Sequence, residues 1–518
     1  MKLKLNYNRI VFVSMAFFLI QLFWQCYDTL IPKILTDKFG MSQTLSGVFM
    51  ALDNMLALFL LPLFGSISDK CKSRFGKRTP FIVIGTVLAC VLFIFLSFAD
   101  NWQLTNIEAV SGQDQIAVKS ELYNAELGDI TDKIHDKYVT EEEYLSIPVY
   151  TLDQNGVETK TYTEEYKSFV VPARQAYAWQ RTVANPAPMI VFVVLLLFTL
   201  ISMSIFRSPA VALMPDVTPK PLRSKANAVV NMLGGLAGAM VLGMGIVFGT
   251  DSNRNSLMSY TVFFSVVAGL MMIALLVFIF TVKEKKWAEE SRMISEKYGI
   301  TDEAKEEAAR HGDRHLSAGE LRSLILLLLS VAFWYIGYNS VTSKYSVYAP
   351  QVLGVGVNTT LLIAMVVAFV AFVPVAILSS KLGRKKTILV GVGMLGVSFF
   401  VASFIRAGAP EWLMYLFFGI AGIGWAAINV NSFPMVVELA TGSDVGRYTG
   451  LYYTASMAAQ AVAPVLGGVF LDRIGMEAMF PFGFVAVAAS FVTMFFVKHG
   501  DSKPEAVSKL EALGGGDD

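Results

Sequence analysis

The sequence predicts an all-α membrane protein of twelve transmembrane helices, arranged as two six-helix pseudo-repeats with a small extracytoplasmic α+β insert. Composition is the first observation: of 518 residues, 54% are hydrophobic and 16% are charged, as is typical of polytopic membrane proteins. The second is a series of twelve apolar runs, each close to or above the roughly 20 residues that a spanning helix needs. The third is a polar stretch, residues 283–319, that divides these runs into two groups of six.

The apolar runs define an N-terminal half, residues 1–282, and a C-terminal half, residues 320–498, followed by a cytoplasmic tail, 499–518. The predicted spans are 9–31, 42–64, 79–99, 187–213, 223–250, 257–282, 320–347, 356–379, 387–407, 411–438, 446–471 and 477–498. The first run is long and has no clear small-residue cleavage site. We therefore interpret it as a retained helix rather than a signal peptide.

The distribution of basic residues predicts the orientation of the spans. Between the second and third spans, residues 65–80 contain one carboxylate, Asp69, and five cations: Lys70, Lys72, Arg74, Lys77 and Arg78. The loop at 381–386 is also basic, whereas the connection at 348–358 carries no charge. Because Lys and Arg are retained on the cytoplasmic side during insertion, we expect a multi-pass protein of the cell membrane with both termini in the cytoplasm.

Several classes of function are not supported by the sequence. A net charge of +1 gives no indication of a nucleic-acid partner. The P-loop pattern fails at Cys71 and Arg78, so we expect no nucleotide and no other cofactor. His311 and His315 share a helix face but have no further ligands, and we expect no metal site. No nucleophile and base pair is recognisable, so an enzyme is not expected.

A long polar insert, residues 100–186, lies between the third and fourth spans, where this topology places it outside the cell. It contains 15 acidic and 7 basic residues, a net charge of −8, and no cysteine. Thr140 and Glu143 fit a helix capping box, and Asn155-Gly156 indicates a hairpin turn. We predict a small α+β cap. A role in screening substrates or contacting the cell envelope is possible in principle, but a tolerated surface insertion is favoured.

The stretch that divides the two halves is a solvated and partly helical linker. Residues Lys283 to Glu320 carry 8 basic and 10 acidic side chains, so their charges nearly balance. Ser317 and Glu320 fit a second capping box, which predicts the start of the seventh span.

The basic loop also contains a recognisable motif. Gly65, Asp69, Gly76, Lys77 and Arg78 form a G-x-x-x-D...G-[KR]-R pattern. This pattern resembles the signature loop after the second helix of major facilitator superfamily transporters. Its expanded spacing is similar to the sucrose/proton symporter and glycoside-pentoside-hexuronide:cation symporter branches. The resemblance implies the major facilitator fold, with glycines that allow a tight turn at the membrane surface. The alternative is a plain cytoplasmic basic loop.

A second segment, residues 206–228, strengthens this resemblance. An Arg and a Pro end the fourth span, and A-L-x-x-D and R-x-x-A-N follow, as in the same region of sucrose-type symporters. We expect Asp216 and Arg223 to form a cytoplasmic charge cluster with Asp69 and Arg74. Such a cluster would hold the outward-facing state shut and open when water enters, because exposed ion pairs contribute little stability.

The second half repeats these features with one departure. Glu438 and Arg447 follow the tenth span as Asp216 and Arg223 follow the fourth. Residues 379–386 correspond to the basic loop, but Ser380 stands where an acid is expected. We therefore predict a weaker charge cluster in the second half.

The first span carries a polar stripe. Gln21, Trp24, Gln25 and Asp28 have the spacing of one helix face. Because polar side chains facing lipid are costly, this face is expected to point into the bundle and to bind substrate.

Carboxylates inside spans are candidates for cation coupling. Asp53 lies near the middle of the second span, where an ionised carboxylate costs at least about 2.5–3.5 kcal/mol. We interpret Asp53 and Asp28 as groups that alternate between charged and neutral forms, because desolvation raises the proton affinity of a carboxylate. The alternatives are a structural hydrogen bond for Asp53 and simple exposure at the outer vestibule for Asp28. All four histidines lie outside the predicted spans, which excludes a histidine relay.

Other polar or aromatic groups in the spans are further candidates for substrate binding. They are Asn54, Asn227, Asn231, Trp334, Asn339, Lys344, Asn429, Asn431 and Gln460. Lys344 has three possible roles: pairing with Asp28, bonding a ligand, or reaching the membrane interface. Amides, carboxylates and aromatic faces together suit the hydroxyls and carbon surfaces of a sugar, although polar groups also join membrane helices.

These features favour a secondary transporter that takes up a sugar or glycoside, such as a disaccharide, with a coupling cation, most simply H⁺. Partners are then the solute, the cation and the lipid bilayer, and the protein is expected to work as a monomer. The alternative is a facilitator-fold exporter of amphipathic organic compounds. A membrane-embedded enzyme or receptor whose outer cap does the work is disfavoured because no catalytic signature is present.

Overall fold

The computed structural model describes residues 5–153, 155–219, 222–250, 255–297, 317–439 and 445–501. Eleven helices in these residues are long and apolar enough to cross a membrane. Helix α16 (Val357–Leu382) is a twelfth long helix in the described part of the chain, and it contains a shorter apolar stretch. The predicted all-α membrane fold is therefore confirmed. His311, His315 and the tail from residue 502 lie outside the described residues.

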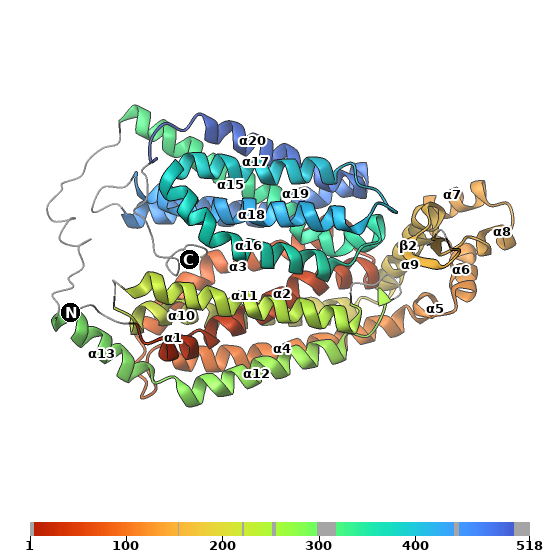
Figure 1. Cartoon of the computed structure of the whole chain (residues 1–518). Coiled ribbons are helices and arrows are strands. Elements are labelled where there is room, and N and C mark those ends of the chain that lie inside the picture. Colours follow the sequence, from red (N-terminus) through yellow and green to blue (C-terminus); the bar gives the residue numbers. More distant parts are fainter. Residues whose placement is uncertain are drawn as a thin grey trace.

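Two bundles of helices lie side by side (Figure 1). The N-terminal bundle contains α1 (Tyr7–Val13), α2 (Met15–Lys33), η1 (Ile34–Lys38), α3 (Gln43–Asp69), α4 (Thr79–Asn106), α10 (Ala187–Val217), α11 (Arg223–Phe248) and α12 (Thr261–Thr281). The C-terminal bundle contains α15 (Ala318–Tyr348), η5 (Ala349–Leu353), α16, α17 (Arg384–Ala402), α18 (Glu411–Val437), α19 (Val445–Ile474), η7 (Met476–Ala478) and α20 (Met479–Phe495). Helix α13 (Glu284–Lys297) belongs to the segment between the bundles and begins with the predicted linker. The predicted capping box of Ser317 and Glu320 is confirmed at the start of α15.

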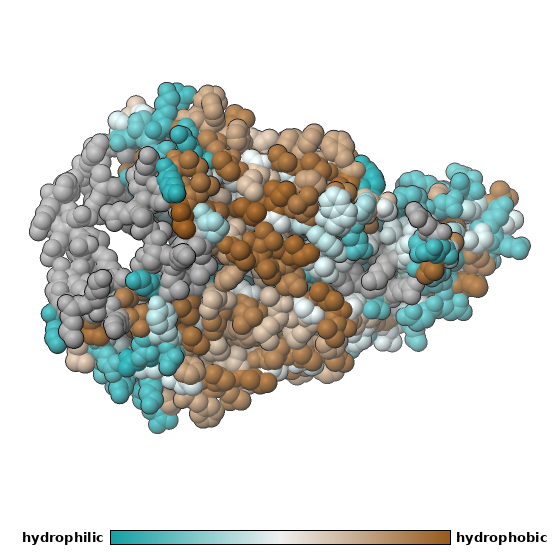
Figure 2. Space-filling view, in the orientation of Figure 1, coloured by the Kyte–Doolittle hydropathy of each residue, from teal (hydrophilic) through white to brown (hydrophobic). Residues whose placement is uncertain are grey.

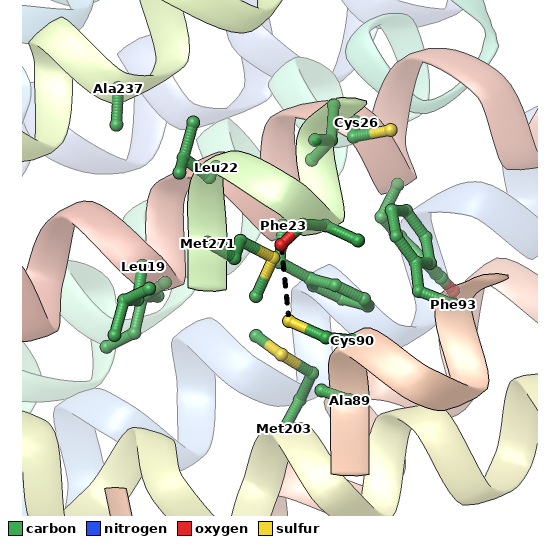
Figure 3. Packing of buried hydrophobic residues seen from close by; sticks show 14 of the residues in the cluster. Leu19, Leu22, Phe23, Cys26, Ala89, Cys90, Phe93, Met203, Ala237 and Met271 are labelled. Atoms are coloured by element: carbon green, nitrogen blue, oxygen red, sulfur yellow. Dashed lines mark hydrogen bonds between the residues drawn. The ribbon is translucent and has the colours of Figure 1, made fainter. Parts of the chain in front are cut away.

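Each bundle has its own hydrophobic core, as expected when apolar helix faces are buried against one another. In the N-terminal bundle, Phe93 meets the edge of Phe264 at a ring distance of 4.4 Å. Figure 3 shows Phe23, Cys90 and Met271 packed together, with the Cys90 thiol donating to the backbone oxygen of Ala268 at 3.8 Å. On the face shown in Figure 2, apolar side chains cover the middle of the two bundles, whereas hydrophilic residues gather at both ends. This distribution fits a bilayer around the middle of the molecule.

The polar insert forms a small folded unit at one end of the bundles (Figure 1). Helix α4 continues to Asn106, so this cap comprises residues 107–186 rather than beginning at residue 100. It contains α5 (Glu108–Ser111), α6 (Gln115–Asn124), α7 (Asp129–Lys137), α8 (Glu141–Leu145), β1 (Tyr150–Leu152), β2 (Glu158–Tyr162), η2 (Tyr166–Val170) and α9 (Val171–Ala184). The α+β character, the antiparallel hairpin and the capping box of Thr140 and Glu143 are confirmed.

The two bundles touch at the end that carries the cap, called here the cap side; the opposite end is the linker side. The Asp472 carboxylate of α19 accepts from the backbone N–H groups of Gln43 and Thr44, at 2.8 and 2.7 Å. A side chain at Gly47 would collide with the carbonyl oxygen of Pro464. Most buried residues of α3 lie between Gln43 and Ala51, which is its cap-side third. The described conformation is therefore closed on the cap side.

A buried ion pair joins α4 to η1 near the cap. The Lys38 ammonium lies 2.6 Å from the Asp100 carboxylate, and both side chains are fully buried. Lys38 also donates to the Met258 carbonyl at 2.8 Å and lies 4.1 Å from the centre of the Tyr260 ring. These contacts compensate for the desolvation of the two charges.

We expect Asp100→Ala to lower the free energy of unfolding by about 3–5 kcal/mol, because it leaves the Lys38 charge buried without its carboxylate. The double variant Lys38→Met/Asp100→Leu should recover most of that loss. Thermal unfolding of purified protein in detergent measures both effects. Glu296→Gln, which removes one partner of the exposed Arg292 pair, is the control. Equal stability of Asp100→Ala and the control would contradict the assignment.

Candidate solute and cation site

Helix α2 lies at the centre of the molecule, since it packs against α10, α11 and α12 of its own bundle and against α15 of the other. Its polar stripe faces these neighbours. A side chain at Gly234 of α11 would meet Gln21, and one at Gly238 would approach the Gln25 side-chain oxygen. Asp28 is exposed although Tyr27 and Thr29 beside it are buried. The Asp28 carboxylate therefore lies on the surface that α2 presents between the bundles.

A second carboxylate and an arginine lie near Asp28. On α3, the Asn54 side-chain amide donates to Asp53 Oδ1 at 2.8 Å. Asp28, Asp53 and Arg207 of α10 interact electrostatically. The Arg207 guanidinium also lies over the Trp24 ring, 5.3 Å from its centre. We refer to Asp28, Asp53 and Arg207 as the central charge cluster.

Arg207 was not among the predicted site residues. The sequence shows an arginine inside the predicted fourth span, which is a signal in itself, because a charge within a span requires a partner. With one guanidinium and two carboxyl groups, the central charge cluster carries a net charge of −1 when both carboxyls are ionised. It becomes neutral when it takes up one monovalent cation or one proton.

Helices α15 and α18 of the C-terminal bundle carry an aromatic pair that is not fully buried. Tyr338 of α15 stacks on Trp425 of α18, with ring centres 3.7 Å apart and planes inclined by 7°. Tyr335 meets the edge of the same indole. All three side chains are partly exposed, and Asn339 beside them donates to the Tyr335 carbonyl at 2.9 Å. Flat, half-exposed rings of this kind can stack on the carbon-hydrogen face of a sugar. Trp425 was not predicted, because aromatic residues are common throughout the spans.

Some predicted substrate contacts lie elsewhere. Trp334 is fully buried within the core of the C-terminal bundle, where it cannot reach a ligand. Asn431 is buried and bonded to Ser379 and to the Ala427 carbonyl, so it joins α18 to α16. For these two residues, the prediction of substrate binding is wrong in this conformation. Asn429 is nearly buried, at 9% exposure, whereas Asn227, Asn231 and Gln460 are partly exposed.

Lys344 has none of the three predicted roles. Its ammonium is completely buried and donates to the Gln43 carbonyl oxygen at 2.6 Å. It therefore lies at the cap-side junction of the bundles, beside the Asp472 carboxylate that binds the N–H of the same residue. Two side chains of the C-terminal bundle, Lys344 and Asp472, thus bind the first turn of α3.

On the linker side, the predicted charge cluster is present but with a different arginine. Arg78 pairs with Asp69 and, at 2.8 Å, with Asp216. Lys77 lies 3.2 Å from Asp216. The predicted partner Arg74 instead lies over the Phe75 ring at 4.6 Å. We call Asp69, Lys77, Arg78 and Asp216 the linker-side cluster.

The second predicted arginine, Arg223, also lies outside the linker-side cluster. Its guanidinium donates to the carbonyl oxygens of Thr218 and Pro215, which closes the turn before α11. The prediction that Arg74 and Arg223 supply the positive charges was therefore wrong. Both side chains instead contact groups close to them in sequence: Arg74 contacts Phe75, and Arg223 contacts the carbonyls of Pro215 and Thr218.

The two motif glycines have different roles. Gly76 has a φ of +120°, as expected for a turn that other residues rarely adopt. Gly65 lies within α3 rather than in a turn, and a side chain there would collide with Ser208 of α10. Glu284 of α13, which was not predicted, accepts from the backbone N–H groups of Arg78 and Thr79 at 2.8 and 2.7 Å. It holds the start of α4 beside the linker.

In the second half, Glu438 pairs with Arg384 at the start of α17. This pair corresponds in position to the pair of Asp216 and Arg78. The side chains of Ser380 and Arg447 lie outside the described part of the structure, so the predicted pairing of Arg447 is not tested.

Comparison with family models decides the family. The model described as Major Facilitator Superfamily matches residues 176–377 and 355–514, which together cover more than half of the chain. The chain belongs to the major facilitator superfamily. A second model, MFS/sugar transport protein, matches residues 12–111 of this superfamily transporter. The recognised resemblance is thereby confirmed, and the protein is a multi-pass membrane transporter rather than an enzyme.

Curated relatives match only parts of this superfamily transporter. It is 26% identical to an uncharacterized MFS-type transporter of Methanocaldococcus jannaschii over 125 residues, 24% of this chain and 32% of the relative. It is 32% identical to the sucrose transport protein SUT3 of Oryza sativa subsp. indica over 62 residues, 12% of each chain. The matches thus span less than a third of either relative's length.

Solved structures share the fold over nearly the whole chain. The inward-open conformation of the xylose transporter XylE from E. coli has a TM-score of 0.57 and 15% identity, covering 97% of this chain and 99% of that one. A bacterial homologue of the iron transporter ferroportin in its inward-facing state has a TM-score of 0.56 and 11% identity, covering 95% and 98%. At such low identity, these similarities establish the architecture alone.

The linker-side cluster of this superfamily transporter provides a test. We expect Arg78→Gln to reduce the initial rate of transport at least about tenfold, because it removes the partner that Asp69 and Asp216 share. Each charge-assisted bond contributes about 1.5–3 kcal/mol in favourable geometry, and about 1.4 kcal/mol corresponds to a factor of ten. Asp69→Asn should also reduce the initial rate of transport, without preventing insertion of the protein into the membrane. Rates are measured in proteoliposomes with matched protein content. Arg74→Gln is the control. Loss of transport in Arg74→Gln equal to that in Arg78→Gln would refute the assignment.

Proposed function

We propose that this superfamily transporter is a symporter that couples the uptake of a sugar or glycoside, such as a disaccharide, to the entry of a cation, most simply H⁺. The central charge cluster is the observation on which the proposal rests. Two carboxyl groups and one guanidinium lie on three helices, next to the half-buried indole of Trp24 and the amides of Gln21, Gln25 and Asn54. Acidic groups that can change charge, adjacent to sugar-binding chemistry, are what coupled transport requires.

The arrangement of charges suggests the order of events. When both carboxyls are ionised, the excess negative charge attracts a proton or a metal cation, and Asp28 is the more exposed of the two. Neutralising that charge lowers the cost of moving the cluster through a closed, dehydrated intermediate. Arg207 stabilises the remaining carboxylate. A solute whose hydroxyls bond the neutralised cluster would then be carried only together with the cation.

The two bundles supply the moving parts of the proposal. We propose that residues 1–282 and 320–498 rock against each other, so that the surface between them opens alternately to each side of the membrane. In this scheme both termini and the linker are cytoplasmic, the cap is extracytoplasmic, and one chain in the cell membrane suffices. The contacts of Asp472 and Lys344 then close the outer gate, while the linker-side cluster lies at the inner end.

Transport by reconstituted protein tests the function. Purified protein in proteoliposomes is offered radiolabelled sucrose, maltose, melibiose, methyl glucosides and glucuronides, with and without an inward gradient of H⁺ or Na⁺. We expect one ion gradient to drive accumulation of at least one of these solutes. Failure of every solute under both gradients, combined with outward transport of a lipophilic cation, would instead favour the exporter.

A further inference from the structure

A partly open cavity lies beneath the cap and is separate from the central charge cluster. The cavity has a volume of about 250 Å³ and lies between the cap and the loop that precedes α12. Its walls come from three parts of the chain: residues 110–115 at the end of α5 and the start of α6, residues between Val149 and Arg174, and residues 256–258. This volume is below the roughly 300–1,000 Å³ of sites for drug-sized ligands, so it suits a single small ring.

One wall of the cavity is aromatic. Tyr150 and Tyr162 stack with ring centres 5.6 Å apart, and Tyr162 and Tyr166 follow at 4.7 Å. The Tyr166 hydroxyl donates to the Gln115 side-chain oxygen at 2.9 Å, which fixes both groups at the wall. Tyr162 and Tyr166 are buried, at 2% and 1% exposure, so they support the wall from behind, and Tyr150 is the half-buried ring. Tyr150 offers an apolar ring face, and the half-buried Gln115 amide offers hydrogen bonds beside it. This combination recognises a hydroxylated ring.

A buried cation faces the same cavity. Arg174 of α9 is only 8% exposed and bonds the Tyr162 side chain. Burial opposes the charge of Arg174, but Tyr162, Tyr166 and Asp37 nearby raise its pKa, so the guanidinium stays charged. A fixed guanidinium donates hydrogen bonds to hydroxyl or carboxylate oxygens. It therefore adds a polar end to the aromatic wall.

The cavity lies directly outside the closed junction of the bundles. A smaller cavity of about 10 Å³ shares Tyr162, Arg174 and Ser256 with it. The rest of this smaller cavity is lined by residues of both bundles, among them Asp37 and Gln351, which are themselves joined by a hydrogen bond of 3.3 Å. Arg174 and Tyr162 thus separate the larger cavity from the junction. A ligand held there would sit at the entrance to the path between the bundles.

We propose that this cavity is a second carbohydrate site, which holds one sugar ring, neutral or acidic, beneath the cap before the bundles open. Tyr150 stacks on the ring, the buried Tyr162 and Tyr166 hold Tyr150 and Gln115 in place, and Gln115 and Arg174 bond the ring's oxygens. The proposal rests on the proposed function in assigning sugars to the transport path. It also gives the cap, interpreted from the sequence as a tolerated insertion, a role in collecting the solute.

Protection of an introduced thiol tests the site in the full-length protein. Ser111→Cys places a thiol in the wall of the cavity, in a background carrying Cys71→Ser; the two remaining cysteines, Cys26 and Cys90, are buried. The alkylation rate is measured in detergent with sucrose, methyl β-glucoside or glucuronate as the probe. We expect at least one sugar to slow alkylation fivefold or more, and to do so equally when Asp53→Asn weakens the central site. A thiol from Val157→Cys, on the exposed cap surface, should not be protected.

Two variants show whether the proposed groups bind the sugar. Gln115→Ala and Arg174→Lys should each raise the half-protecting concentration about tenfold, and circular dichroism checks that the cap stays folded. The site is overturned if none of the three sugars protects the Ser111→Cys thiol, or if protection is unchanged in both variants. Protection without any transport would leave the site standing and refute the symporter, whereas transport without protection would refute only the site.

Discussion

Asp28→Asn should abolish uphill accumulation of solute while leaving downhill exchange across the membrane largely intact. The substitution keeps the size and shape of the side chain, replaces one acceptor oxygen with an amide NH₂ donor, and removes the capacity to change charge. One positive charge crossing a potential of roughly 100 mV releases about 2.3 kcal/mol. At about 1.4 kcal/mol per tenfold, this energy sustains nearly fiftyfold accumulation. The accumulation ratio of Asp28→Asn should therefore fall from about fiftyfold toward one.

Accumulation and exchange of the same radiolabelled solute, measured in one preparation of proteoliposomes, separate coupling from binding. Asp136→Asn in the cap is the matched control, since it replaces an exposed carboxylate with the same amide. Asp53→Asn should also impair coupling. It is expected to weaken solute exchange as well, because Asp53 orients Asn54. Accumulation near the wild-type ratio by a well-expressed Asp28→Asn protein would exclude Asp28 as the coupling group.

Asp472→Asn should lower the population of the conformation closed on the cap side, relative to the open one, by at least about tenfold. The Asp472 carboxylate accepts two backbone N–H bonds at the start of α3, and hydrogen bonds to a charged group contribute about 1.5–3 kcal/mol each. These contacts join the two bundles and so exist only while the cap side is closed. The free energy lost with even one of these bonds exceeds about 1.4 kcal/mol, which is the amount that changes a population ratio tenfold.

A buried reporter on α3 measures the shift. Ser46 is completely buried next to this junction, so a thiol from Ser46→Cys should react slowly with an impermeant reagent added on the cap side. Asp472→Asn should accelerate that reaction about tenfold. Glu477→Gln, which removes an exposed ion pair within the C-terminal bundle, should not change it. Equal rates in all three proteins would show that Asp472 does not hold the gate.

Much of the fold could be predicted because its signals are local. A run of about 20 apolar residues indicates a spanning helix whatever its neighbours are. The capping residues at Thr140 and Ser317 bond within one turn, and both boxes are present. The stripe from Gln21 to Asp28 follows from helical periodicity alone. The capping boxes and the stripe depend on residues fewer than eight positions apart, and a spanning helix depends on one continuous run.

Contacts between side chains on different helices could not be predicted from such local patterns. Arg74 and Arg78 are both basic residues of one loop, and only the packing of α3 against α10 brings Arg78, rather than Arg74, between Asp69 and Asp216. Lys344 is a lone charge in the sequence, and its partner at Gln43 is 301 residues away. Trp334 and Trp425 look alike as aromatic residues of spans, yet one is in the core and the other is half-exposed.

The sequence by itself determined the membrane class, the number of spans, the acidic cap and the presence of carboxyl groups within the bilayer. Only the tertiary structure decided which of those groups meet, which polar residues join helices instead, and that a cavity lies beneath the cap. The physical reason is the separation in sequence between the groups that interact. Hydrophobic transfer and helix capping act within a segment, whereas charge pairing and cavity shape depend on atoms that the chain brings together from remote positions.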